Sequence, residues 1–157
     1  MKLKKVRITN YRCFRKVDID FDDHTTLIVG KNGAGKTAIL DAVAVAVSTF
    51  LLGIDGGVSR SISKDDARYE FHDLDGTVDP QHQFPVSIES TGDCLDNHDV
   101  KWVRSLNSES GNTTIKEARQ LTNISKDVQK RIMTGDKSLI LPLISYYGTG
   151  RLYAQKK

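Results

Sequence analysis

Apolar and polar residues alternate near the start of the chain, and this pattern predicts β-strands. Leu3, Val6 and Ile8 stand among basic residues in the stretch 2–9. Residues 15–21 alternate more strictly, with Val17, Ile19 and Phe21 on one side and Lys16, Asp18 and Asp20 on the other. Successive side chains of a strand point to opposite faces. Both stretches are therefore predicted as strands, the second with one face exposed.

The next pattern combines a short β-branched run with a longer apolar run. Residues 25–29 read Thr-Thr-Leu-Ile-Val and are predicted as a buried strand. Residues 36–52 are apolar and rich in alanine, and Gly53 follows them. This run is too long for a typical strand, so a helix ending at Gly53 is predicted, packed between two layers.

The middle of the chain changes character twice. Residues 53–83 are polar and rich in turn-forming residues, which predicts a variable, loop-rich insertion with at most short elements. Residues 84–90 and 100–106 are then predicted as two strands, joined as a hairpin through the polar stretch 91–99.

The last part of the chain predicts a helix followed by a strand. Apolar residues recur every three or four positions over 114–133, which indicates an amphipathic helix. Thr114 and Glu117 form a capping-box pattern at its start, and Gly135 is a plausible end. Residues 138–147 are predicted as a buried strand that leads out of the domain.

Composition narrows the class only slightly. The chain has 157 residues, a formal net charge of +3 and a pI near 8.8, which suits one domain and does not by itself indicate nucleic-acid binding. Cys13 and Cys94 have no metal-ligand spacing and fit a reducing compartment. No apolar run approaches the length of a membrane span. A cytoplasmic protein without membrane contact is therefore expected.

The strongest chemical signal is the match of residues 30–37 to the pattern G-x-x-x-x-G-K-[ST]. Such a loop points successive backbone N–H groups at phosphate oxygens, while its lysine reaches the β- and γ-phosphates and its hydroxyl holds Mg²⁺. A predicted strand precedes the loop and a predicted helix follows it, as this motif requires. The expected ATP-binding residues are Gly30, Lys31, Asn32, Gly33, Ala34, Gly35, Lys36 and Thr37, and Thr37 is the expected Mg²⁺ ligand.

Three weaker signals have simpler interpretations. Residues 73–78 read Asp-Leu-Asp-Gly-Thr-Val, like the nucleophile motif of haloacid-dehalogenase-type phosphatases. The preceding residues 67–72 are mostly polar and no later magnesium motif follows, so we interpret the segment as an acidic turn. The four histidines fit no metal-ligand spacing. Trp102 is predicted to pack in the core.

The N-terminal third resembles the ABC-type ATPase heads of the SMC, RecF and OLD class. The resemblance rests on the loop form G-x-N-G-x-G-K-T, on Asn-Tyr-Arg-Cys-Phe at residues 10–14, and on Ile-Leu-Asp-Ala at 39–42. It implies an α/β P-loop NTPase fold: the N-terminal lobe of a head, with an antiparallel β layer beside a P-loop strand–helix unit. It also implies that Arg12 lies near the nucleotide phosphates and that Asn32 faces the γ-phosphate.

Two departures from that class matter. The glutamine that normally follows the exit strand of the first lobe is replaced by Tyr147, so the second Mg²⁺ contact is not identified. No Leu-Ser-x-Gly signature and no Asp-Glu strand end follow the loop, and the catalytic base is expected beyond Lys157. Residues 1–157 are therefore expected to form one incomplete head, whose partner is the remainder of the same head or the other half of a split one.

Residues 141–152 resemble the ATPase subunit of the Septu and retron-linked anti-phage systems. That likeness implies a defence ATPase that pairs through its heads and acts with an HNH-type nuclease and retron components. Tyr147 and Arg151 would then be possible nucleotide-state switches. The alternatives are a nucleotide-dependent assembly module without turnover, a DNA-repair ATPase and a small-molecule kinase. DNA binding is left open because the basic residues are dispersed.

Overall fold

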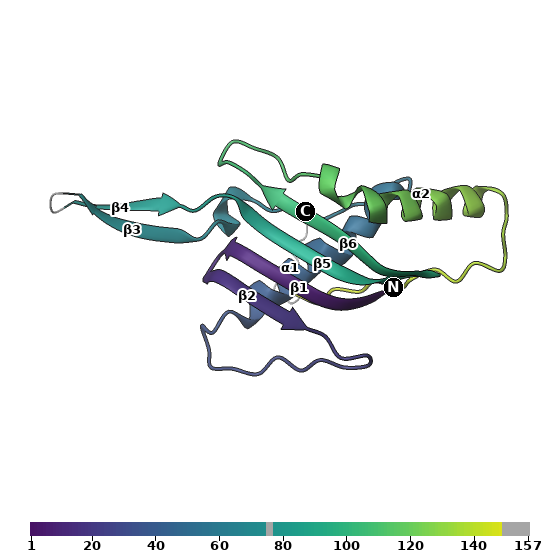
Figure 1. Ribbon diagram of the computed structural model, residues 1–157, viewed down its shortest axis with the longest axis horizontal. Coiled ribbons are helices and arrows are strands. Elements are labelled where there is room, and N and C mark those ends of the chain that lie inside the picture. The colour runs from purple at the N-terminus through teal and green to yellow at the C-terminus, as the bar shows by residue number, and fades with distance from the viewer. Residues whose placement is uncertain (75–76, 149–157) are drawn as a thin grey trace, which may run out of the picture.

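A four-stranded antiparallel sheet organises the domain. The computed structural model describes residues 1–74 and 77–148 (Figure 1). The strands follow the order β2-β1-β5-β6, and their bounds are Lys2–Tyr11 for β1, Phe14–Asp20 for β2, Val86–Cys94 for β5 and Asn97–Leu106 for β6. All four were predicted from alternation. The β5–β6 turn is tighter than expected, because the strands extend through most of the polar stretch 91–99.

The helix after the P-loop packs on the inner face of this sheet. Helix α1 (Lys36–Ser48) continues as a 3₁₀ turn, η1 (Thr49–Gly53), which matches the predicted helix 36–52. Val6, Ile8 and Ile88 from the sheet form the core with the small residues of α1, such as Ala42 and Ala46. Close packing of α1 is possible because alanines face the strands. The described residues supply a sheet layer on only one side of α1, not the two layers expected.

Helix α2 closes a second core at the other end of the sheet. It spans Arg119–Met133, follows the 3₁₀ turn η3 (Lys116–Ala118), and packs on η1 and β6. Trp102 is buried there and donates its indole N–H to the carbonyl of Ala46 at 3.0 Å, which confirms its predicted core role. Gly135 adopts a φ of 76° just past the helix end, which confirms the predicted stop.

The predicted capping box of the second helix is wrong. The helix begins at Arg119, five residues after Thr114, and its start has no side-chain cap. The Thr114 hydroxyl instead accepts a hydrogen bond from the backbone N–H of Ser105 at 3.1 Å. Thr114 therefore satisfies the edge of β6 rather than the end of a helix.

A hairpin that the sequence did not predict projects from the domain. Strands β3 (Tyr69–Leu74) and β4 (Thr77–His82) form a separate two-stranded sheet that extends away from the main sheet (Figure 1). A 3₁₀ turn, η2 (Lys64–Asp66), precedes it. Both strands lie within the predicted loop-rich region 53–83. The phosphatase-like motif falls on the turn of this hairpin, partly outside the described residues.

Two predicted strands do not form. Residues 25–29 and 138–147 have no regular secondary structure, and Leu27, Val29 and Leu143 are 83%, 81% and 93% exposed. A buried strand needs neighbouring strands to bond its N–H and C=O groups. Among the described residues, no strand pairs with either segment. The apolar content of these segments therefore remains at the surface.

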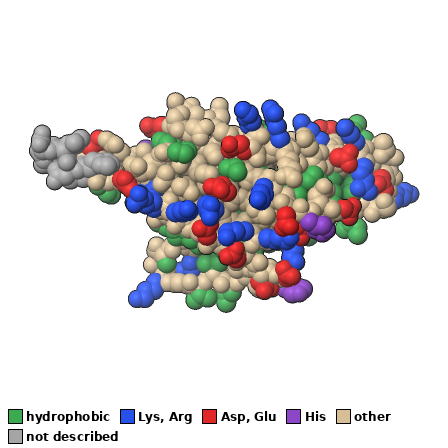
Figure 2. All heavy atoms as spheres, viewed as in Figure 1, with side chains coloured by type: hydrophobic (Ala, Val, Ile, Leu, Met, Phe, Trp, Pro, Cys, Tyr) green, Lys and Arg blue, Asp and Glu red, His purple; other side chains and the backbone are tan. Residues whose placement is uncertain are grey.

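The outer face of the sheet carries charges of both signs. Lys/Arg and Asp/Glu side chains are interspersed across the face shown in Figure 2. Arg7 pairs with Asp18 at 2.7 Å across β1 and β2, and Lys4 pairs with Asp93 at 2.7 Å across β1 and β5. This arrangement is typical of a solvated sheet face, and it agrees with the dispersed basic residues of the sequence.

One helical run is long and apolar enough to cross a membrane by length and composition alone. It spans Lys36–Gly53, which corrects the expectation that no such run exists. In the fold, 61% of this run is buried inside the domain, as for the core helix of a soluble protein, which passes the same test. The run therefore gives only weak evidence for a membrane span.

Candidate functional site

The loop 30–37 has the backbone of a phosphate-binding loop. Gly33 and Gly35 adopt φ angles of 82° and 86°, a left-handed conformation that favours glycine. The Lys36 ammonium lies over the loop and donates to the carbonyl oxygens of Gly30 and Lys31 at 2.7 and 2.8 Å. The loop is thus wrapped around the lysine that the motif assigns to the β- and γ-phosphates.

The start of α1 supplies the remaining donors. Gly35 is the residue before the helix, and Thr37 lies in the first turn with its side chain exposed. A helix N-terminus presents N–H groups and a partial positive charge, and no acidic residue stands in this first turn. An ammonium, backbone N–H groups and one hydroxyl suit a nucleotide triphosphate with Mg²⁺. The residues predicted for this role lie together on one loop.

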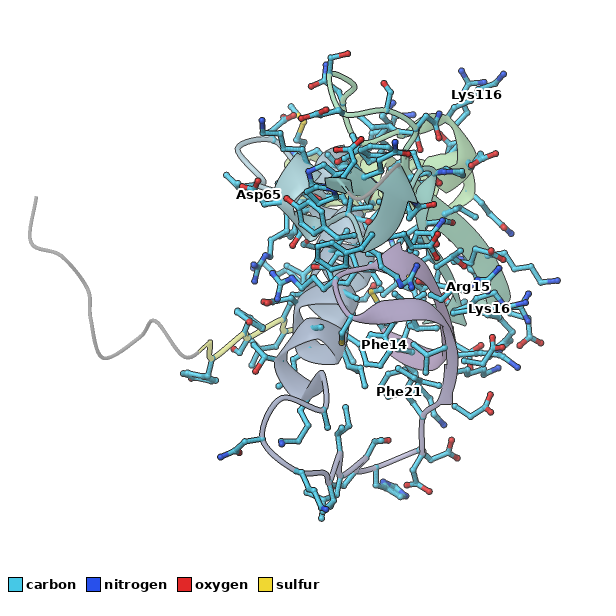
Figure 3. All side chains as sticks on the ribbon, turned by 90° about the vertical axis from the view of Figure 1, so that its left-hand side faces the viewer. Phe14, Arg15, Lys16, Phe21, Asp65 and Lys116 are labelled. Atoms are coloured by element: carbon cyan, nitrogen blue, oxygen red, sulfur yellow. The ribbon has the colours of Figure 1, made fainter. Side chains whose placement is uncertain are left out.

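The turn between β1 and β2 packs directly on the last glycine of the loop. A Cβ on Gly35 would lie 2.5 Å from Cζ of Phe14 and 2.6 Å from Sγ of Cys13. In Figure 3, Phe14 extends inward toward α1, whereas Arg15 and Lys16 extend toward solvent. Glycine is required at this position by both its backbone conformation and its neighbours. The contact brings the residues of the β1–β2 turn to the edge of the P-loop.

Arg12 lies on that turn, but its guanidinium contacts carboxylates. Nε pairs with Asp66 at 2.8 Å and Nη1 pairs with Asp41 at 2.6 Å. The backbone N–H of Arg12 also donates to the carbonyl of Asp66 at 2.7 Å, so η2 fixes the residue twice. The side chain is 36% exposed. Phosphate contact by Arg12 stays a prediction, with the difference that the arginine is already paired.

Asp41 is the centre of this charged cluster, and the sequence analysis did not single it out. Its carboxylate is 9% exposed and accepts from Arg12, from Arg60 at 3.1 Å, and from the hydroxyl of Tyr146. The guanidinium of Arg60 stacks over the Tyr146 ring, 4.9 Å from its centroid. One signal in the sequence marks Asp41: it is the only charged residue in the apolar run 38–47.

The electrostatics of the cluster favour its charged forms. Burial opposes ionisation of Asp41, but hydrogen bonds from Tyr146 and Arg12 outweigh it and lower the pKa of that carboxyl. The same hydrogen bond to Asp41 raises the pKa of the Tyr146 hydroxyl, which stays protonated and donates. Two arginines face Asp41 and Asp66, so the formal charges of the cluster balance.

The two predicted switch residues have different positions. Tyr147 is 75% exposed, and its neighbour Tyr146 makes the contact with Asp41. Arg151 lies outside the described residues. The switch role of Tyr147 and Arg151 stays a prediction.

With this geometry described, the comparison with known protein families decides the class. Residues 5–157 match the family model described as AAA domain. The chain belongs to the AAA domain family. This match confirms the predicted α/β fold of the P-loop ATPase type, with its antiparallel sheet and P-loop helix. ATP binding, usually with Mg²⁺, is the common property of such an AAA domain.

Curated relatives place this AAA domain with the RecF and Rad50 ATPases. It is 32% identical over 117 residues to the DNA replication and repair protein RecF of Actinobacillus pleuropneumoniae serotype 5b, covering 71% of this chain and 29% of the relative. It is 42% identical over 65 residues to the DNA double-strand break repair Rad50 ATPase of Methanosarcina acetivorans, covering 41% and 5%. The chain thus spans less than a third of either relative.

A solved chain from a study of the structural biochemistry of ATP-driven dimerization and DNA-stimulated activation of SMC ATPases is also similar. The TM-score is 0.49 at 20% identity, over 90% of this AAA domain and 87% of the solved chain. A likeness at this level adds nothing to the argument. The family match and the RecF relative carry the assignment to an ATPase domain of the SMC, RecF and Rad50 type.

Proposed function

We propose that this chain binds Mg·ATP on loop 30–37 and that the complete protein hydrolyses it. The observation that carries the proposal is the loop itself, with left-handed Gly33 and Gly35 and with the Lys36 ammonium held over its carbonyls. Lys36 and the N-terminus of α1 would neutralise phosphate charge, and Thr37 would hold Mg²⁺. Asn32 would face the γ-phosphate.

The proposal includes an incomplete head. The catalytic base is expected outside this chain, and a second lobe would cover the apolar side chains that the described residues leave exposed, among them Leu27, Val29 and Leu143. Two such heads would close face to face around two nucleotides, as the resemblance implies. Hydrolysis would open them and change the state of a partner.

The test compares two lysine variants. Lys36→Ala should weaken binding of Mg·ATP at least tenfold by calorimetry, because it removes the charge aimed at the phosphates. Lys101→Ala is the matched control, since that exposed lysine lies on the outer face of β6 and should bind ATP like the wild type. Equal ATP affinity of both variants would remove the loop from the mechanism.

Turnover separates the enzyme from a non-hydrolysing assembly module. Phosphate release by the purified complete protein should continue linearly and should stop in Lys36→Ala. A single nucleotide retained without release would favour the module instead.

For the biological role, we propose a cytoplasmic ATPase of an anti-phage defence complex that acts with a nuclease. Support comes from the likeness of residues 141–152 to Septu and retron-linked ATPases. The names of the RecF and Rad50 relatives favour DNA repair as the second candidate. A plating assay with the complete operon decides: phage protection should be lost in Lys36→Ala and kept in Lys101→Ala. Sensitivity to DNA damage without any change in phage protection would favour repair.

A further inference from the structure

Four side chains meet at the carboxylate of Asp41, and three of them are held by the scaffold. Asp41 itself belongs to the second turn of α1, directly after the P-loop. Arg12 is fixed by a side-chain and a backbone hydrogen bond to Asp66. The fourth group, Tyr146, comes from the segment 138–148, which has no regular secondary structure.

Arg60 is also held in place. Its backbone N–H donates to the hydroxyl of Ser48 at 2.9 Å, at the end of α1. The preceding residue, Ser59, accepts a hydrogen bond from the buried Arg104 of β6 at 2.9 Å. Arg60 is therefore tied to α1 and to the sheet, and it shares Asp41 Oδ1 with Tyr146.

The segment 138–148 has few other attachments. Leu139 and Ile144 are partly buried against the second core, whereas Ile140 and Leu143 are 84% and 93% exposed. Ile144 and Tyr146 line a groove of about 370 Å³ with Leu40, Val43 and Val47 on the outer side of α1. The hydroxyl of Tyr146 is thus the polar contact that joins this segment to the helix of the P-loop.

We propose that Tyr146 is a positioning residue which, through Asp41, couples the segment 138–148 to the P-loop helix and to the two arginines that share the carboxylate. Release of Tyr146 removes one donor from Asp41 and the ring from beneath Arg60. A movement of the segment then changes the set of donors around Asp41, one helical turn from Thr37. This inference rests on the proposed ATP binding, because its functional effect is measured there.

The test removes one oxygen atom. Tyr146→Phe keeps the ring over Arg60 and loses only the hydroxyl, and Tyr69→Phe makes the same change on the β3 strand of the projecting hairpin. Two quantities are measured on the full chain: affinity for Mg·ATP by calorimetry and hydrogen exchange of residues 138–148 with and without ATP. Tyr146→Phe should weaken ATP binding about threefold to tenfold, the range expected when a hydrogen bond to a charged group is lost.

Reciprocity supplies a readout that a purely structural role would not change. Because coupling between two sites acts in both directions, ATP should slow exchange of 138–148 in the wild type and in Tyr69→Phe, and this protection should be lost in Tyr146→Phe. The melting temperature of the nucleotide-free variant should stay near that of the wild type. ATP affinity and protection equal to the wild type in Tyr146→Phe would overturn the proposal. Equal ATP affinity of wild type and Lys36→Ala would instead overturn the proposed function.

Discussion

At the scale of single residues, the P-loop shows two different reasons for glycine. Gly33 and Gly35 share nearly the same left-handed backbone, with φ of 82° and 86°. A Cβ on Gly33 would meet no atom within 4 Å, whereas one on Gly35 would collide with Cys13 and Phe14. Conformational strain acts at both positions, but steric overlap acts only at Gly35.

The two glycines therefore form a matched pair for a stability measurement. Gly33→Ala should lower the free energy of unfolding by about 1 kcal/mol, the usual cost of a left-handed alanine. Gly35→Ala should cost about 2–4 kcal/mol, because overpacking against the β1–β2 turn adds to the same strain. Urea unfolding of both variants measures the difference. Equal losses would show that the turn moves aside without penalty.

At the scale of elements, α2 is seated on η1 through a glycine. A Cβ on Gly53 would lie 2.0 Å from Oγ of Ser125 and 2.7 Å from the backbone oxygen of Thr122. Ser125 is fully buried, so this is the closest approach of helix and turn. Gly53 thus has a second role besides ending the apolar run: it sets how closely the second helix packs on the end of the first.

Gly53→Ala should consequently lower the unfolding free energy by about 1–3 kcal/mol, since α2 must shift away from η1. The control is Gly111→Ala in the loop after β6, where the nearest atom is the Ser108 hydroxyl at 3.1 Å. That surface change should stay within about 0.5 kcal/mol. Thermal unfolding followed by the fluorescence of the buried Trp102 is a suitable measurement, and a loss at Gly53 no greater than at Gly111 would contradict the close packing.

The elements that the sequence predicted correctly are those with a local signal. Alternation in β1 and β2, and the apolar periodicity of α1 and α2, reflect burial of one face within a few residues. The segments 25–29 and 138–147 failed because a buried strand depends on neighbours that its own pattern does not specify. The β3–β4 hairpin was missed because its residues are mostly polar.

The candidate site divides along the same line. The P-loop is contiguous in sequence, so its residues could be assigned to phosphate and Mg²⁺ from spacing alone. The cluster at Asp41 is assembled from β1, α1, the loop before η2 and the segment 138–148, and Tyr146 lies 105 residues from its partner. Pairing over that distance leaves no periodic trace. Only the isolated charge of Asp41 in an apolar run hinted that a partner exists.

At the scale of the whole molecule, two kinds of surface meet on one domain. The outer face of the sheet is covered by ion pairs, whereas the side near the P-loop exposes large apolar residues such as Leu27, Val29 and Leu143 (Figures 1 and 2). Extended apolar exposure on a globular domain marks a surface that contacts other protein. The ion-paired face has the character of a permanent surface, and the proposed second lobe would lie on the opposite side.

The strand order also governs how the chain must fold. Strand β1 pairs with β5, so that Thr9 lies opposite Ser87, and the ladder closes a loop of roughly 80 residues that contains the P-loop and α1. Non-local pairing of this kind is slow because the entropy of loop closure is lost before the contacts form. During synthesis, β1 and β2 leave the ribosome well before β5. The platform for α1 is therefore completed late, and the nucleotide loop acquires its support only when the second half of the sheet has joined.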